Sequence, residues 1–285
     1  MPEVGPIVRG IIAEAAERLR SRGIPESRRE ALRIWSDITG DRSAGASAQI
    51  DVVNPAIREH FERAVARRAA GEPVPYVTGM AGFRHLTLRC DRRALIPRPE
   101  TEGLIDLLLP RVHSGRVADV GTGTGCLALS LAVEGGFNLV IAVDRSSDAI
   151  TLARENAATC RGNAPIHLVE GDVCGPLRGG AFDALVSNPP YLTLDEYAGL
   201  DQSVREWEPA SALIGGAGGL EFTRRLLEQG REVVRSGGWV ALEVDSSRAG
   251  ATARLATQCG WHNVSVYEDL FGRERYLLAQ RSDTR

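Results

Sequence analysis

The sequence contains no lysine, and all 34 of its basic residues are arginine. This absence excludes enzymes that need a lysine to hold nucleotide phosphates in a Walker-type loop or to form a Schiff base. Basic residues are not in surplus either, since 37 acidic residues give a net charge of −3. Such a chain has no overall positive field for a nucleic-acid backbone, so we expect no direct nucleic-acid partner.

Several other features are missing. No apolar run approaches the roughly 20 residues that span a bilayer, and the first six residues lack the basic start and apolar stretch of a secretory signal. The five cysteines are scattered without a C-x-x-C pair, and the five histidines fit no metal-ligand spacing. No G-x-S-x-G motif of a hydrolase is present. We therefore expect a cytoplasmic protein with reduced thiols, no metal and no membrane partner.

The N-terminal part of the chain is predicted to be helical. With 285 residues, the chain is long enough for a main domain and a smaller one. Apolar residues recur at helical spacing around Ile11, Ile34 and Phe61, which predicts three helices within residues 1–73. We expect this small domain to recognise the substrate; the alternative is that it only supports the core of the main domain.

The rest of the chain is predicted to be of the α/β class. Residues 74–98 are expected to form a linker and a β-hairpin, with strands at 83–90 and 94–96. From residue 116 onward, apolar strand segments alternate with helical segments. This alternation is typical of a doubly wound, mainly parallel sheet with helices on both faces. We take residues 99–285 as the main domain.

A glycine-rich loop, Asp-Val-Gly-Thr-Gly-Thr-Gly, ends the first strand of the alternating part at residues 119–125. Glycines let the backbone turn tightly and approach a ligand, and the following helix presents free N–H groups. The spacing G-x-G-x-G departs from the dinucleotide fingerprint. A nucleoside without a pyrophosphate, such as S-adenosylmethionine, therefore fits better than a dinucleotide. The residues expected to bind it here are Gly121, Thr122, Gly123, Thr124 and Gly125.

Acidic residues also follow the second and third strands. The carboxylate of Asp144 can accept both hydroxyls of a ribose. The alternative, that Asp144 caps a helix, is weaker because Ser146 and Ser147 are better placed for that role. Asp172 and Val173 stand where an acid commonly meets the adenine amino group and an apolar residue flanks the ring. Asp172 could equally be an ordinary turn residue.

The next strand ends in the run Asn188-Pro189-Pro190-Tyr191. Two successive prolines cannot continue a ladder, because neither has an N–H group and each fixes φ at about −65°. We expect a rigid turn that brings together the carboxamide of Asn188, the carbonyl of Pro189 and the ring of Tyr191. These groups can hold a planar group that carries an NH2, as methylation of an amide or of an exocyclic amino nitrogen requires.

These features together resemble the class I S-adenosylmethionine-dependent methyltransferases, and two further tracts narrow the resemblance to the HemK/PrmC family. The tract Leu-Ile-Pro-Arg-Pro-Glu-Thr-Glu occupies residues 95–102, and Val-Arg-Glu-Trp-Glu-Pro, followed by Ala-Leu-Ile-Gly-Gly, lies within residues 204–216. The resemblance covers nearly the whole chain. It implies a Rossmann-like, seven-stranded, mainly parallel sheet with a small N-terminal helical domain.

The resemblance also implies an activity. Members of the family methylate the side-chain amide nitrogen of the glutamine in the Gly-Gly-Gln motif of class 1 peptide chain release factors. This implies S-adenosyl-L-methionine as the cofactor and a release factor as the protein partner. Carried over by position, the glycine loop, Asp144, Asp172 and Val173 are implied to bind the cofactor. Asn188 is implied to touch both ligands, Asn188, Pro189 and Tyr191 to be catalytic, and residues 188–191 to hold the glutamine amide.

Other functions stay open on the residues alone. A DNA adenine-N6 methyltransferase shares Asn-Pro-Pro-Tyr, since adenine also offers a planar NH2, but would need a basic DNA-reading region. A cousin that methylates a glutamine of a ribosomal protein is poorly separated by sequence. A noncatalytic cofactor-binding scaffold is disfavoured by the intact motifs. The chain departs from the family pattern at Trp207, Ala217, Gly218 and Asp245.

Overall fold

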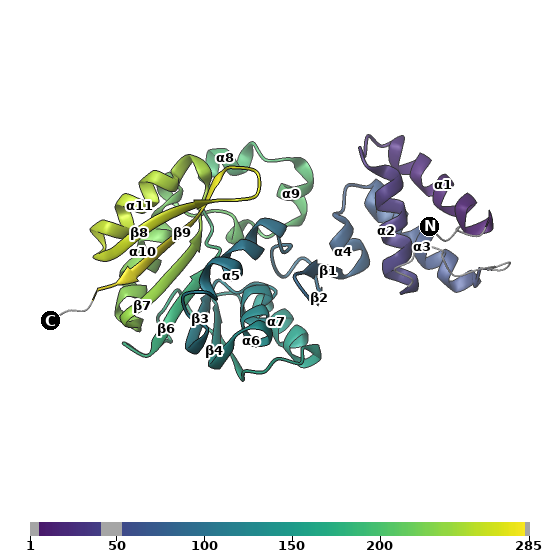
Figure 1. The fold of residues 1–285 in the computed structure, drawn as a ribbon. Helices are drawn as coiled ribbons and strands as arrows, with labels where there is room; N and C mark the ends of the chain where they lie inside the picture. Colours follow the sequence, from purple (N-terminus) through teal and green to yellow (C-terminus); the bar gives the residue numbers. More distant parts are fainter. Residues whose placement is uncertain (1–5, 41–52, 283–285) are drawn as a thin grey trace. The chain divides into compact units, whose positions relative to one another are not determined.

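The computed structural model describes residues 6–40 and 53–282. The chain divides into two compact units, of which the first is helical and the second contains a large sheet (Figure 1). Unit 1 consists of Met1–Met80 with Asp201–Trp207, and unit 2 consists of Ala81–Leu200 with Glu208–Arg285.

The first four helices of unit 1 pack around one apolar core. The helices of this unit are α1 (Pro6–Arg20), α2 (Ser27–Thr39), α3 (Pro55–Ala69), α4 (Val74–Thr78) and α9 (Gln202–Trp207). Trp35 of α2 and Phe61 of α3 meet edge to face in this core, with ring centroids 5.2 Å apart. The Asn54 side chain accepts a hydrogen bond from the Ala56 N–H and caps α3, whose first residue is Pro55. The helical N-terminal region that the sequence predicted is confirmed, and α9 joins this unit from much later in the chain.

Unit 2 is built on a seven-stranded sheet with the order β5-β4-β3-β6-β7-β9-β8. Neighbouring strands are parallel from β5 to β7, whereas β9 is antiparallel to both β7 and β8. The predicted mainly parallel, seven-stranded sheet is therefore confirmed. Its strands are β3 (Ser114–Val120), β4 (Gly136–Asp144), β5 (Ile166–Glu170), β6 (Phe182–Ser187), β7 (Val234–Glu243), β8 (Trp261–Glu268) and β9 (Glu274–Arg281).

Helices cover both faces of this sheet because its central strands are apolar on both sides. Val117 of β3 packs in a cluster with α5 (Glu102–Leu108) and α6 (Cys126–Glu134), and α7 (Ser147–Thr159) contributes to the same cluster. Ala118, the next residue of β3, packs in the opposite cluster with α10 (Glu221–Val233) and α11 (Ala249–Gln258). The longest helices in the described part of the chain have 15 residues, and none is long and apolar enough to cross a membrane.

The segment at residues 74–98 differs from the prediction. A short helix, α4, replaces the start of the expected linker, since prolines in a first helical turn lose no hydrogen bond. The hairpin consists of β1 (Met80–Phe83) and β2 (Leu86–Arg89). The predicted strand at 94–96 is therefore wrong, and the predicted strand at 83–90 contains both the hairpin turn and β2. The hairpin turn contains Arg84, whose guanidinium binds Glu134 at 2.7 Å.

Residues 94–96 are not a strand because the chain turns just before them. The Asp91 carboxylate accepts a hydrogen bond from the N–H of Arg93 at 3.0 Å, and the Ala94 N–H donates to the Asp91 carbonyl at 3.2 Å. An aspartate that bonds its own backbone two residues on favours such a turn over a ladder. Short segments complete unit 2: η1 (Pro99–Thr101), α8 (Leu194–Ala198), η2 (Ala210–Ala212), η3 (Ala217–Gly219) and η4 (Ser246–Arg248).

Candidate active site

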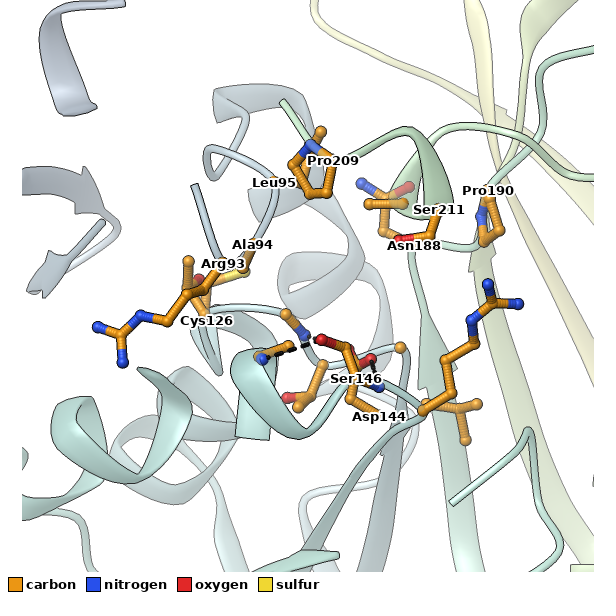
Figure 2. Close-up of a pocket in the computed structure, with 18 of the residues that line it drawn as sticks. Arg93, Ala94, Leu95, Cys126, Asp144, Ser146, Asn188, Pro190, Pro209 and Ser211 are labelled. Atoms are coloured by element: carbon orange, nitrogen blue, oxygen red, sulfur yellow. Dashed lines mark hydrogen bonds between the residues drawn. The ribbon is translucent and has the colours of Figure 1, made fainter. Parts of the chain in front are cut away.

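A cavity of about 300 Å³ lies at the carboxyl edge of the sheet, where β3, β4 and β6 end. The strand order reverses here, because β4 lies on one side of β3 and β6 on the other. Ligands of open α/β sheets bind at such switch points. Figure 2 shows Asp144 and Ser146 at the bottom of the view, with Asn188 and Ser211 above them. All four residues line the cavity.

The glycine loop folds back over the end of β4. The carbonyl oxygen of Val143 accepts hydrogen bonds from the N–H groups of Gly121 at 2.8 Å and Thr122 at 3.0 Å. Gly121 and Gly123 have φ values of 74° and 55°, in the left-handed region that favours glycine. Side chains at these positions would strain the turn. The cavity is lined by Gly121, Thr122, Gly123 and Thr124 but not by Gly125, which is the N-cap of α6.

Asp119 supports this loop from behind, a role that the sequence prediction did not include. Its Oδ2 accepts hydrogen bonds from the Thr122 hydroxyl at 2.6 Å and from the Ala128 N–H at 3.1 Å, so one carboxylate ties the loop to α6. Asp119 is fully buried, and burial raises its pKa to about 7. The signal that could have identified it was an acid directly before the glycines.

The carboxylate of Asp144 lines the cavity and has some of its hydrogen-bond acceptor sites occupied by backbone N–H groups. One oxygen accepts a hydrogen bond from the Gly123 N–H at 2.9 Å, and the other accepts one from the Ser146 N–H at 3.0 Å (Figure 2). A carboxylate has about four lone-pair sites, so about two remain for a ligand's hydroxyl groups. Burial raises the pKa of Asp144, while these backbone N–H groups act against that shift. Ser146, and not Asp144, caps α7, since its side chain accepts from the Ala149 N–H.

Val173 and Asp172 have different surroundings. Val173 is buried, has a φ of 51° and lines the cavity. The Asp172 carboxylate instead pairs with the guanidinium of Arg225, is about half exposed and is not among the lining residues. A contact between Asp172 and a bound adenine therefore stays a prediction.

The Asn-Pro-Pro-Tyr turn forms another part of the cavity wall. Asn188 and Pro190 line the cavity, whereas Pro189 and Tyr191 do not. The residue before the turn is held in place, because the buried Ser187 hydroxyl donates a hydrogen bond to the carbonyl of Val120 at 2.6 Å. Burial raises the pKa of Tyr191 to about 12, so its phenol is neutral at physiological pH.

A second glycine-rich segment packs directly on this turn. Gly215 donates its N–H to the carbonyl of Leu192 at 2.9 Å. A Cβ atom at Gly215 would collide with the Pro190 carbonyl oxygen, and one at Gly219 would collide with the Tyr191 carbonyl oxygen. The two glycines therefore allow backbone to lie on backbone. Ala217 and Gly218, two of the four departures from the family pattern, lie between these glycines in η3 and do not line the cavity.

The tract at residues 94–98 closes the cavity from another side, and all five of its residues line it. The Glu208 carboxylate holds this tract, since it accepts hydrogen bonds from the Ile96 N–H at 3.2 Å and from the Arg98 guanidinium at 2.6 Å. The sequence prediction placed residues 94–96 in a strand and used residues 95–98 for the resemblance, but did not assign any of them to the site. Their spacing alone carries no signal of the contact.

The site suits the binding and orientation of a ligand. Asn188 offers a neutral carboxamide, and Asp144 offers acceptors for hydroxyl groups. Within residues 6–40 and 53–282, no cluster of three or more histidine, cysteine or acidic residues could hold a metal ion. The arrangement can hold a nucleoside and a planar amide together.

Comparison with known proteins places the chain among methyltransferases. Residues 11–79 match the family model of the PrmC N-terminal domain, and residues 100–199 match that of the methyltransferase small domain. A release factor glutamine methyltransferase of Moorella thermoacetica is 38% identical over 97% of this chain and 99% of the relative. One of Deinococcus radiodurans is 37% identical over 96% of this chain and 99% of the relative.

A solved structure shows the same fold. A methyltransferase of Pyrococcus furiosus superposes with a TM-score of 0.53 and 20% sequence identity, over 78% of this chain and all of that chain. The fold therefore agrees with the family that the two tracts at residues 95–102 and 204–216 suggested and that the relatives show over nearly the whole chain.

Proposed function

The chain belongs to the release factor glutamine methyltransferase family, and from that premise we propose that it methylates the glutamine of the Gly-Gly-Gln motif in class 1 peptide chain release factors. The enzyme is a methyltransferase that uses S-adenosyl-L-methionine and modifies the side-chain amide nitrogen. The observation that carries the proposal is one cavity lined both by the Asp144 carboxylate and by the Asn188 carboxamide. Such a cavity can hold a nucleoside cofactor beside a planar amide.

The residues present fit this cofactor. The free acceptor sites of Asp144 suit the two ribose hydroxyls, and Val173 offers an apolar contact for the adenine ring. The glycines of the loop leave room for a close approach of the backbone. We therefore assign cofactor binding to residues 121–124, Asp144 and Val173.

Methyl transfer to an amide nitrogen depends more on the orientation of the two reactants than on acid–base catalysis. When bound, the cofactor supplies an electrophilic methyl group. An amide nitrogen is a poor nucleophile because its lone pair is delocalised. The Asn188 Oδ1 and the Pro189 carbonyl can each accept a hydrogen bond from one N–H of the substrate amide. These hydrogen bonds direct the nitrogen at the methyl group and stabilise the positive charge that develops on it. Tyr191 can pack on the amide face.

We assign recognition of the release factor body to the helical unit. A match to the PrmC N-terminal domain over residues 11–79 supports this role. Release factors act in translation, so we place the enzyme in the cytoplasm. A chain that begins near Val74 is expected to lose activity on the whole release factor; full activity would contradict the role of the helical unit.

Mass spectrometry tests the proposed function. The protein is incubated with S-adenosylmethionine and the release factor of its host, and the intact mass and peptide masses are measured. We expect a gain of one methyl group on the Gly-Gly-Gln glutamine, and no gain with the Asn188→Ala variant. Methylation of a ribosomal protein or of DNA instead would overturn the assignment of substrate, and no methyl transfer to any of them would overturn the enzyme itself.

A further inference from the structure

Two consecutive hydrogen bonds connect the side chain of Asn188 to a buried carboxylate. Nδ2 of Asn188 donates to Oγ1 of Thr101 at 3.0 Å, and Oγ1 of Thr101 donates to Oε2 of Glu243 at 2.6 Å. Thr101 and Glu243 are each 2% exposed. Because water has so little access to them, these groups depend on one another for their hydrogen bonds.

Separate elements of unit 2 bring these residues together. The residues directly before Asn188 and Glu243 are paired in the sheet, so both side chains emerge side by side where β6 and β7 end. Thr101 ends η1, where the carbonyl of Glu100 accepts a hydrogen bond from the Tyr276 hydroxyl at 2.6 Å. Tyr276 is itself paired with Glu243 across β7 and β9. The register of the sheet thus determines the positions of the residues that form these two hydrogen bonds.

Glu243 has a cation close to its second oxygen. Nη1 of Arg275 lies 3.9 Å from Oε1 of Glu243, and Nε of Arg275 binds Asp269 at 2.8 Å. The pKa of Glu243 lies above its ordinary value, mainly because of burial, while the hydrogen bond from Thr101 and the charge of Arg275 act against this rise. Both of these contacts favour the ionised carboxylate.

The direction of the hydrogen bonds decides which end of the Asn188 amide is free. An ionised carboxylate can only accept, so the hydroxyl proton of Thr101 points to Glu243. The lone pairs of Thr101 Oγ1 are then left for Asn188, which must offer its NH2 group. No residue in the described part of the chain donates a hydrogen bond to Oδ1 of Asn188. That oxygen remains available as an acceptor in a residue that lines the cavity.

Steric packing alone does not determine which way the Asn188 amide is turned. The two ends of a carboxamide have nearly the same size, so a half-turn changes the hydrogen bonds but hardly the fit. In the rotated form, the NH2 group of Asn188 would face the NH2 group of a glutamine substrate. Two donors would then meet without an acceptor, and the developing positive charge on the substrate nitrogen would be destabilised.

We propose that Thr101 and Glu243 are positioning residues for methyl transfer: their hydrogen bonds hold the amide of Asn188 with Oδ1 toward the NH2 group of the substrate. The inference rests on the proposed function. It assigns a task to two buried polar residues through their contact with Asn188; Thr101 also lines the cavity, whereas Glu243 lies behind it.

The kinetic test replaces the hydroxyl of Thr101 by a methyl group. In Thr101→Val, kcat is expected to fall at least about tenfold, while the Kd for S-adenosylmethionine stays within about twofold. Thr101→Ser keeps the hydroxyl and is expected to retain kcat within about threefold. Thr252→Val is the matched control, because Thr252 is 1% exposed and its hydroxyl donates a hydrogen bond to the carbonyl of Arg248, away from Asn188. A kcat of Thr101→Val close to that of the unmodified enzyme overturns the proposal.

A double-mutant cycle separates positioning from a general structural role. If Thr101 acts through Asn188, Thr101→Val causes no further loss of the residual kcat once Asn188→Ala is present. A structural defect would lower the rate in both backgrounds by the same factor. Equal factors in the two backgrounds therefore overturn the proposal, whereas the loss of the Thr101 effect supports it.

A measurement without turnover keeps the two proposals distinguishable. In the NMR spectrum of the full chain, the side-chain NH2 protons of Asn188, identified by their absence in Asn188→Ala, should show nuclear Overhauser contacts to Thr101. An amide turned the other way overturns the inference even if the enzyme is active or Thr101→Val fails to fold. If the unmodified protein transfers no methyl group to glutamine, it is the proposed function that fails, while the NMR contact still decides the orientation.

Discussion

The guanidinium of Arg98 donates a hydrogen bond of 2.6 Å to the carboxylate of Glu208. The second oxygen of the same carboxylate accepts from the Ile96 N–H at 3.2 Å, and Glu208 is only 5% exposed. The two tracts that carried the family resemblance, at residues 95–102 and 204–216, therefore meet at one buried carboxylate. The first tract lines the cavity, so this contact holds part of the cavity wall.

Loss of Arg98 should destabilise unit 2. In Arg98→Ala, the N–H of Ile96 is the one donor to the buried Glu208 carboxylate that remains among the described residues. Because Arg98 is itself partly exposed, we expect the loss of its charge to cost about 2 kcal/mol or more, below the cost for a fully buried pair. Urea unfolding followed by circular dichroism measures the change. Arg20→Ala is the control, because its ion pair with Glu17 is exposed and such pairs add little stability. Equal stability of Arg98→Ala and the unmodified protein would show that the contact does not stabilise the fold.

Asn188→Ala should abolish most of the turnover and leave the fold intact. The variant loses the acceptor that we assign to the substrate amide, so we expect a fall in kcat of at least about a hundredfold, which is about 2.7 kcal/mol. Steady-state methylation of the release factor measures the rate, and thermal unfolding checks the fold. Asn163→Ala, a change of an exposed asparagine outside the cavity, is the control. A rate within about tenfold of the unmodified enzyme, about 1.4 kcal/mol, would exclude the amide-holding mechanism.

Asp144→Asn should weaken cofactor binding more than it affects the fold. The amide can keep one of the two backbone hydrogen bonds, from Gly123 or Ser146, but offers fewer acceptors to ribose hydroxyls. We expect the Kd for S-adenosylmethionine to rise at least about tenfold in titration calorimetry. Asp148→Asn is the control, since Asp148 also lines the cavity but lies in the first turn of α7. An unchanged Kd for Asp144→Asn would remove the ribose assignment.

Gly215→Ala should damage the Asn-Pro-Pro-Tyr turn. The added Cβ collides with the backbone oxygen of Pro190, which cannot move as a side-chain end could. We expect lower thermal stability together with a strongly reduced kcat. Gly82→Ala is the matched control, because a Cβ there meets nothing within 4 Å. If both variants behave alike, the close backbone packing has no functional effect.

The pH dependence of stability should reveal Asp119. Burial raises its pKa from the ordinary value of 3.8 to about 7, so between these values the folded protein binds more protons at this site than the unfolded chain. Stability therefore falls as the pH rises through this window, and the full cost is present above pH 7. Asp119→Asn removes the titration. Urea midpoints at pH 5 and pH 8 should differ less in the variant than in the unmodified protein; the same difference in both would contradict the raised pKa.

Local patterns in the sequence predicted much of the fold. The apolar periodicity of the strands and helices is set by neighbouring residues, because burial on one or both faces imposes its own spacing. The prolines after Asn188 and the glycines at residues 121–125 likewise act through their own φ angles. These constraints need no distant partner, so the alternating main domain, the helical N-terminal region and the position of the two motifs could be read directly.

Contacts between distant residues decided the rest. The turn at Arg84 and the course of residues 94–96 depend on groups elsewhere in the chain, such as Glu134 and Glu208. Asp172 has the type and place of an adenine ligand, yet its carboxylate pairs with Arg225, 53 positions away. A local turn at Asp91 precedes residues 94–96, but no local pattern identifies the distant partners Glu134, Glu208 and Arg225.

The amino-acid sequence by itself determined that a carboxamide ends one strand and a carboxylate another, since strand ends and turns follow from local residue preferences. Only the tertiary structure decided which end of the Asn188 amide is free. That choice depends on Thr101 and Glu243, which are 142 positions apart in the chain and meet because the sheet register and η1 bring them together. Hydrogen-bond direction is a property of the folded neighbourhood, and spacing along the chain carries no record of it.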